Sequence, residues 1–172
     1  MSSSIKIYFA ADHAGYKLKE HLLRFVDHLD FGADTQYEIE DLGAHEYNET
    51  DDYPDFVSLA ARAVSEAAAR GEDARAIILG GSGQGEAIVA NRFPRVRAVV
   101  FNGQYAPIDG RIVPYEIVIA REHNDANVLS LGARFLSEQD AEETVRLWLT
   151  TPFSGEERHR RRIEKIEQYP GA

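Results

Sequence analysis

Short apolar runs alternate along the chain with segments whose apolar residues recur every three or four positions. The runs predict strands at residues 5–10, 37–42, 76–79, 96–101 and 128–131. The helical patterns cover residues 16–27, 54–70, 86–92, 137–149 and 156–168, and residues 115–122 fit a short helix better than a strand. Strands that alternate with helices are typical of a parallel sheet with helices on both faces.

The chain has 172 residues, a length that predicts one domain spanning 1–172. In parallel α/β folds, ligands bind beyond the carboxyl ends of the strands. Asp12-His13, the loop from Gly80 to Glu86, Asn102 and Arg134 all follow predicted strands. We therefore expect these residues to gather at one edge of the sheet.

The loop after the third predicted strand carries the clearest chemical signal. Four glycines stand within six residues, and a helical pattern follows at once. Glycines let several backbone N–H groups approach one ligand, so the loop is suited to an anion such as a phosphate or a developing oxyanion. Glu86 stands at the loop's exit, and a carboxylate beside an anion cradle suggests a base.

Familiar glycine motifs do not fit this loop. Gly85-Glu86-Ala87 lacks the Gly-Lys-Ser/Thr ending of a Walker loop. Glu86 replaces the third glycine of a dinucleotide fingerprint, and Gln84 replaces the closing glycine of a nucleophile elbow around Ser82. A purely structural strand-to-helix turn remains an alternative.

Charge and composition narrow the function classes. The formal net charge is −10, which argues against nucleic-acid and anionic-membrane partners. There is no cysteine, which excludes disulfides, zinc–thiolate sites and cysteine catalysis. The first residues lack the apolar core of a signal peptide, and no apolar run is long enough to span a membrane, so we expect a cytoplasmic protein.

Three polar clusters each allow a structural and a functional interpretation. Asp12-His13 could handle hydroxyl protons, or Asp12 could cap the first helix and leave His13 exposed. The segment 121–127 could supply metal ligands, although the second cluster of ligands that such a site needs is not evident. Its structural interpretation is a helix end whose His and Asn side chains bind backbone. Residues 158–162 form the only basic cluster, suited either to clamping a phosphate or to salt bridges on an exposed helix.

Together these motifs resemble the ribose-5-phosphate isomerase B family of sugar-phosphate isomerases, over nearly the whole chain. The resemblance rests on Ala11–Gly15, Asp52–Asp55, Gly80–Gly85, Ala90–Arg92, Arg97-Ala98, Arg121–Leu129, Gly132–Arg134 and Arg158–Ile163. It implies a Rossmann-like αβα sandwich with a five-stranded parallel sheet. It also implies a homodimer or homotetramer with active sites shared between subunits, and a C-terminal helix (156–168) packed on a neighbouring subunit.

The resemblance also assigns roles to residues of this chain. It implies an aldose–ketose isomerisation through an enediolate, with no metal and no cofactor. Asp12, His13 and Tyr53 would contact the sugar, and the amides of Gly81, Gly83 and Gly85 would hold the enediolate oxygen. His123 would open the sugar ring with Asn124 beside it, while Arg134, Arg158 and Arg162 would bind the phosphate.

Two departures from the family pattern bear on the chemistry. Many members use a cysteine as the base where this chain has Ser82, and a second branch has serine there with a glutamate four residues later, which Glu86 matches. Glu86 is therefore the expected base, with Ser82 as a hydrogen-bonding helper. The connection from Asn102 to Pro114 is longer than usual, which puts the substrate in question more than the reaction.

The sequence thus predicts interconversion of ribose 5-phosphate and ribulose 5-phosphate, with Glu86 moving the proton. One alternative is the same chemistry on a hexose 6-phosphate or a tetrose 4-phosphate. Another is a sugar-phosphate-binding protein without catalysis.

Overall fold

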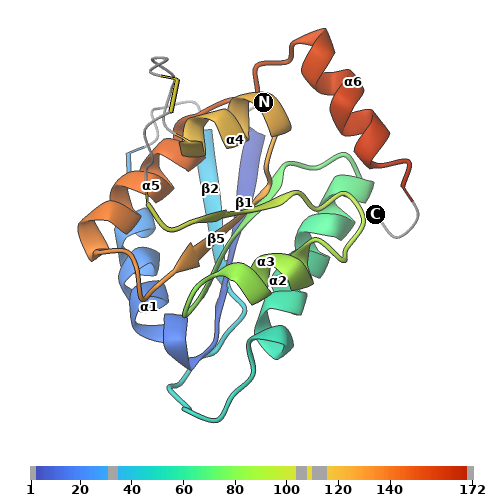
Figure 1. Cartoon of the computed structure of the whole chain (residues 1–172). Helices are drawn as coiled ribbons and strands as arrows, with labels where there is room; N and C mark the ends of the chain where they lie inside the picture. Colours follow the sequence, from blue (N-terminus) through green and yellow to red (C-terminus); the bar gives the residue numbers. More distant parts are fainter. Residues whose placement is uncertain (1–2, 31–34, 104–107, 110–115, 170–172) are drawn as a thin grey trace.

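Five parallel strands form one sheet in the order β2-β1-β3-β5-β4 in the computed structural model (Figure 1), which describes residues 3–30, 35–103, 108–109 and 116–169. The strands are β1 (Ser3–Ala11), β2 (Thr35–Asp41), β3 (Ala74–Gly80), β4 (Ala98–Phe101) and β5 (Val128–Gly132). The helices are α1 (His13–Asp27), α2 (Tyr53–Ala69), α3 (Gln84–Ala90), α4 (Glu116–Asn124), α5 (Glu138–Thr150) and α6 (Glu157–Ile166). The predicted α/β class and the five-stranded parallel sheet are confirmed.

Two apolar cores lie on opposite faces of the sheet, because side chains alternate along each strand. Ile7 and Phe9 of β1 face a core that includes residues of α1, α4 and α5. Tyr8 and Ala10 face the other core, which α2 and α3 cover. The strands β3 and β5 are buried along their whole length, as expected for central strands of a parallel sheet.

The strand register brings the carboxyl ends of the strands to one edge. Ala11 of β1 pairs with Leu79 of β3, and Gly80 pairs with Gly132 of β5. Phe101, the last residue of β4, pairs with Leu131. The segments that follow these strands therefore start side by side, as the sequence predicted.

Element boundaries differ from the predictions where a local bond intervenes. Helix α1 begins at His13, three residues earlier than expected, because the Asp12 side chain accepts hydrogen bonds from the amides of Ala14 and Gly15. β4 begins two residues late, because Val96 belongs to a turn in which its N–H donates to the Phe93 carbonyl. The predicted long connection at 102–114 lies mostly outside the described residues.

Helix α6 lies outside the two helix layers and contacts α4 (Figure 1). The expectation that this helix packs on a neighbouring subunit, and that the chain is one domain, stays a prediction. Over the residues that the structure describes, no helix combines the length and apolar character needed to cross a membrane.

Gly15 fixes how closely α1 approaches the sheet. A Cβ on Gly15 would lie 2.6 Å from both the carbonyl carbon and the carbonyl oxygen of Leu79 in β3. Backbone atoms cannot move aside as a flexible side chain can. Only glycine therefore fits where α1 crosses the end of β3, directly behind the Asp12-His13 segment.

We expect Gly15→Ala to lower the free energy of unfolding by about 1–3 kcal/mol, the usual cost of overpacking. In a helix without this contact, replacing glycine by alanine would raise the free energy of unfolding by about 0.5–1 kcal/mol. Chemical denaturation measures the difference. Gly71→Ala is the control, because Gly71 has φ 74° and open space around it, so it reports backbone strain alone. A Gly15→Ala variant as stable as the wild type would contradict the close approach.

Candidate active site

The glycine loop after β3 is shaped by side chains that press against its backbone. Gly83 has φ 73°, in the left-handed region. A Cβ on Gly85 would lie 2.5 Å from the Tyr53 hydroxyl oxygen, and one on Gly81 would lie 3.0 Å from Cζ of Arg134. Tyr53 and Arg134 therefore lie against the loop in the same chain. The edge position was predicted for Arg134, whereas strand order did not predict it for Tyr53.

Glu86 folds back over the end of β3. A Cβ on Gly80 would lie 1.5 Å from Glu86 Oε1, so the carboxylate occupies the space that a side chain at Gly80 would need. Glu86 is only 4% exposed. Burial raises its pKa above the usual 4.5, the charge of Asp12 raises it further, and a hydrogen bond from its own backbone N–H lowers it. The carboxylate is thus a stronger proton acceptor than an exposed glutamate.

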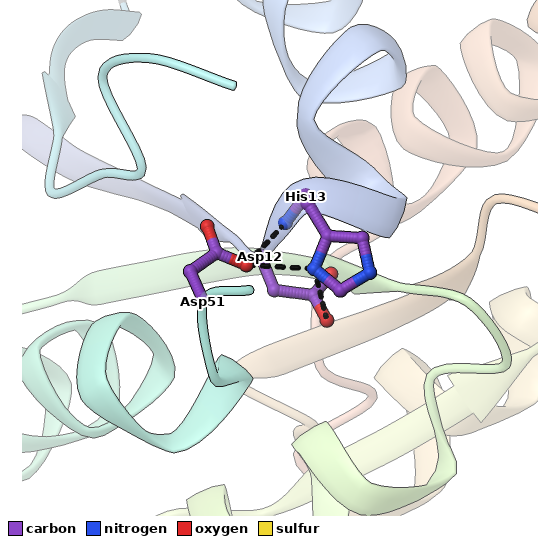
Figure 2. A group of neighbouring side chains, drawn as sticks. All are labelled: Asp12, His13 and Asp51. Carbon is purple, nitrogen blue, oxygen red and sulfur yellow. Dashed lines mark hydrogen bonds and ion pairs between the residues drawn. The ribbon is translucent and has the colours of Figure 1, made fainter. Parts of the chain in front are cut away.

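Asp12 and His13 join this edge of the sheet together with Asp51, a residue that the sequence did not single out (Figure 2). His13 Nδ1 lies 2.7 Å from Asp51 Oδ1, and the His13 backbone N–H donates to the same oxygen at 2.9 Å. Asp12 Oδ2 lies 3.9 Å from His13 Nδ1. The hydrogen bond to Asp51 raises the pKa of His13 above 6.5, with a smaller contribution from Asp12.

The structural interpretation of Asp12-His13 is partly confirmed, and a role for the pair in moving hydroxyl protons stays a prediction. Asp12 does cap α1, but the expectation of a solvent-exposed histidine is wrong, because His13 is held against Asp51. The order of the strands explains why Asp51 lies beside His13. β1 and β2 are parallel neighbours, so the acidic segment after β2 meets the start of α1 at the same edge.

Among the described residues, one group of side chains has the spacing of metal ligands, namely Asp12, His13 and Asp51, whose ligand atoms lie within 4.8 Å of one another. One oxygen of each carboxylate in this group is engaged, whereas Asp51 Oδ2 is buried without a hydrogen-bond partner among the described residues. Asp51 Oδ1 accepts two hydrogen bonds from His13, and Asp12 Oδ1 accepts from two amides. The segment 121–127, which lies entirely within the described residues, contributes to no such group.

His123 and Asn124 lie at the opposite edge of the sheet. They end α4, just before β5 begins, and the Asn124 carbonyl accepts from Arg97 Nε at 2.9 Å just before β4 begins. The five residues of β5 separate them from Arg134. At about 3.3 Å per residue this is a distance of about 15 Å, so one chain does not bring His123 to Glu86.

A basic cluster surrounds His123 at this second edge. The rings of His123 and His159 lie 4.2 Å apart, and Ser154 Oγ lies 2.9 Å from Nδ1 of His159. Burial lowers the pKa of His159, and nearby His123, Arg158 and Arg162 lower it further. Arg158 also pairs with Glu156 at 2.7 Å, as the structural interpretation of the basic segment predicted.

The predicted site residues thus fall into two groups at opposite edges of the sheet. The first contains Asp12, His13, Tyr53, Gly81, Ser82, Gly83, Gly85, Glu86 and Arg134, and the second contains His123, Asn124, Arg158 and Arg162. The first group joins a buried carboxylate to the glycine loop and an exposed guanidinium. The second group offers two exposed guanidinium groups and an imidazole.

Comparisons with known proteins point to one enzyme class. A family model described as Ribose/Galactose Isomerase matches residues 7–166. Ribose-5-phosphate isomerase B of Mycobacterium tuberculosis H37Rv is 38% identical over 169 residues, covering 97% of this chain and 91% of the relative. The crystal structure of ribose-5-phosphate isomerase B from Mycoplasma genitalium with bound ribulose-5-phosphate has a TM-score of 0.78 at 30% identity and covers 97% of each chain. A structure of the Clostridium thermocellum enzyme has a TM-score of 0.75 at 37% identity and covers 95% of each chain.

Replacing Asp51 with asparagine should remove the larger of the two contributions that raise the pKa of His13. Since the folded pKa exceeds the unfolded value, the stability from this bond is complete below pH 6.5 and is lost as pH rises through the folded pKa. We expect Asp51→Asn to lose more stability near about pH 5 than near about pH 9. Denaturant unfolding at both pH values measures the loss, and NMR titration of His13 follows the pKa. An equal loss at both pH values would show that the His13 bond is not the cause.

Proposed function

Because the chain belongs to the ribose/galactose isomerase family, we propose that it interconverts ribose 5-phosphate and ribulose 5-phosphate through an enediolate. The relatives named above carry this activity in their names, and one related structure holds ribulose-5-phosphate. The observation that carries the proposal is the buried Glu86 carboxylate folded against a glycine loop suited to an oxyanion.

Glu86 is the proposed base. It takes the proton from C2 of the open-chain aldose. The electrons of that C–H bond form a C1–C2 double bond while the electron pair of the C1 carbonyl moves to O1, which leaves an enediolate. The amides of Gly81, Gly83 and Gly85 stabilise the oxyanion, and Ser82 donates a hydrogen bond to a sugar oxygen. A proton passes from the O2 hydroxyl to O1, and Glu86 returns its proton to C1 as the C2–O2 bond becomes the carbonyl, which completes the ketose.

The raised pKa of Glu86 supports this role, because a general base works best when its pKa approaches the working pH. The reaction moves two protons within the substrate, one from C2 to C1 and one from O2 to O1, and changes no net oxidation state. The proposal therefore includes no metal and no cofactor.

His13, Tyr53 and Asp12 are the proposed sugar contacts of the same chain, and Arg134 is a phosphate contact. The hydrogen bond between Nδ1 and Asp51 supports this role for His13, because it fixes the orientation of the imidazole ring. Nε2 then points away from Asp51. The guanidinium of Arg134 lies against Gly81, within reach of the same ligand.

The remaining contacts are proposed to come from a second copy of the chain. His123 opens the sugar ring with Asn124 beside it, and Arg158 and Arg162 complete the phosphate site. Their position at the far edge of the sheet supports this arrangement, because two copies related by a twofold axis can place the edge of one against the opposite edge of the other. The proposed protein is a homodimer, or a homotetramer built from such dimers.

Glu86→Gln should reduce kcat for ribose 5-phosphate by about 10²–10⁴-fold, the usual contribution of a positioned base. KM should change little, since the amide keeps the shape of the side chain. Ser82→Ala should cost less than Glu86→Gln. A panel of pentose, hexose and tetrose phosphates, assayed with both variants, also tests the choice of substrate.

Glu66→Gln is the matched control, because Glu66 is an exposed glutamate of α2. Near wild-type turnover by Glu86→Gln would rule out the base assignment. A wild-type chain that binds ribose 5-phosphate without turning it over would make the protein a binder.

Shared active sites predict complementation between two inactive variants. A heterodimer of Glu86→Gln and His123→Ala subunits carries one site with both defects and one intact site. Random mixing should therefore restore about a quarter of the wild-type activity. Subunits are mixed under exchanging conditions and turnover is measured; each variant mixed with itself is the control. If mixing restores nothing although mass spectrometry detects heterodimers, Glu86 and His123 do not serve one site across the interface.

A further inference from the structure

Every carbonyl from Gly80 to Gly83 accepts a hydrogen bond. The Gly80 carbonyl accepts from the Ala133 N–H at 2.9 Å, and the Gly81 carbonyl accepts from the Arg134 N–H at 3.2 Å. Two side chains supply the next bonds. Asn102 Nδ2 donates to the Ser82 carbonyl at 3.0 Å, and Ser130 Oγ donates to the Gly83 carbonyl at 2.7 Å.

These bonds fix the direction of the loop's amides. A peptide unit is planar and trans, so the C=O of one residue and the N–H of the next point in opposite directions. A Ser82 carbonyl held toward Asn102 turns the Gly83 N–H away from the ends of β4 and β5. A rotated peptide would instead present its carbonyl to the ligand and repel an anion.

We infer that Asn102 is a positioning residue for isomerisation, which holds the Ser82–Gly83 peptide so that the Gly83 N–H faces the enediolate oxygen. This inference rests on the proposed function. Ser130 supports the next peptide in the same way. Neither side chain belongs to the residues that the family resemblance assigned to substrate.

Asn102 is built into a tight place. A Cβ on Gly132 would lie 2.1 Å from Asn102 Oδ1, so the glycine in β5 makes room for the amide. Asn102 Oδ1 is buried and has no hydrogen-bond partner in the described chain. The bond to the Ser82 carbonyl is then what fixes the amide's orientation, because the reverse orientation would face two oxygens toward each other.

The orientation of the glycine loop depends more on Asn102 than on Ser130. Among the residues that the structure describes, Asn102 is the one donor to the Ser82 carbonyl. The Gly83 carbonyl also accepts from the Ala87 N–H at 3.2 Å, in the first turn of α3. Loss of Asn102 should therefore disturb the loop more than loss of Ser130.

The test measures Asn102→Ala and Ser130→Ala by steady-state kinetics with ribose 5-phosphate. We expect kcat to fall about tenfold for Asn102→Ala, less than for complete removal of an oxyanion donor, and by a smaller factor for Ser130→Ala. KM, and the inhibition constant of inorganic phosphate, should stay within about twofold, because the guanidinium groups are untouched.

Asn91→Ala is the matched control. Asn91 Nδ2 donates to the Ala98 carbonyl at 3.0 Å, a bond of the same kind that lies away from the loop. The inference is overturned if kcat of Asn102→Ala falls no more than that of Asn91→Ala. It is also overturned if KM and phosphate inhibition weaken in proportion to kcat. Should Asn102→Ala fail to fold, the same criteria apply to Ser130→Ala.

A separate readout distinguishes failure of this inference from failure of the proposed function. If the wild-type chain does not isomerise ribose 5-phosphate, the proposed function fails. Crystal structures of the wild type and Asn102→Ala then decide the positioning role. A rotated Ser82–Gly83 peptide supports it, and an unchanged peptide overturns it.

Discussion

The contact between the Glu86 carboxylate and the backbone at Gly80 is the constraint on which the site depends. It requires glycine at the end of β3, and it removes the carboxylate from water while keeping it at the mouth of the loop. Desolvation and the nearby charge of Asp12 both make the group a better base. The same contact that closes the end of the strand therefore raises the proton affinity of the carboxylate, as the proposed role of Glu86 as a base requires.

Parallel strands explain why the predicted site residues fall into two groups. Residues that follow a strand and residues that precede one lie at opposite edges, however close they are in sequence. His123 and Arg134 are separated by only one strand along the chain, and that strand carries them apart. A second copy of the chain is the simplest way to reunite them, and the position of α6 outside the helix layers is consistent with a role in that contact (Figure 1).

The sequence predicted the fold well, and it predicted which polar residues follow the carboxyl ends of the strands. Both predictions follow from periodicity and strand order. The alternation of apolar runs and helical patterns leads directly to five parallel strands. Arg134 and Glu86 lie against neighbouring glycines of one loop because each comes after a strand. Asp51 was missed, because it lies in an irregular acidic loop where no spacing marks the residue that turns toward His13. The bond from Asn102 to the Ser82 carbonyl was also beyond the sequence, since it depends on strand neighbours that are far apart in the chain.

Because the two groups of predicted site residues lie at opposite edges of the sheet, the proposed activity depends on the concentration of the protein. Under the proposed arrangement a solitary chain is well folded, with both apolar cores complete, yet holds only half of each catalytic set. Turnover then obeys mass action between chains: the output of very dilute protein grows with the square of its concentration. Expression level would act as a threshold on flux without any separate regulator.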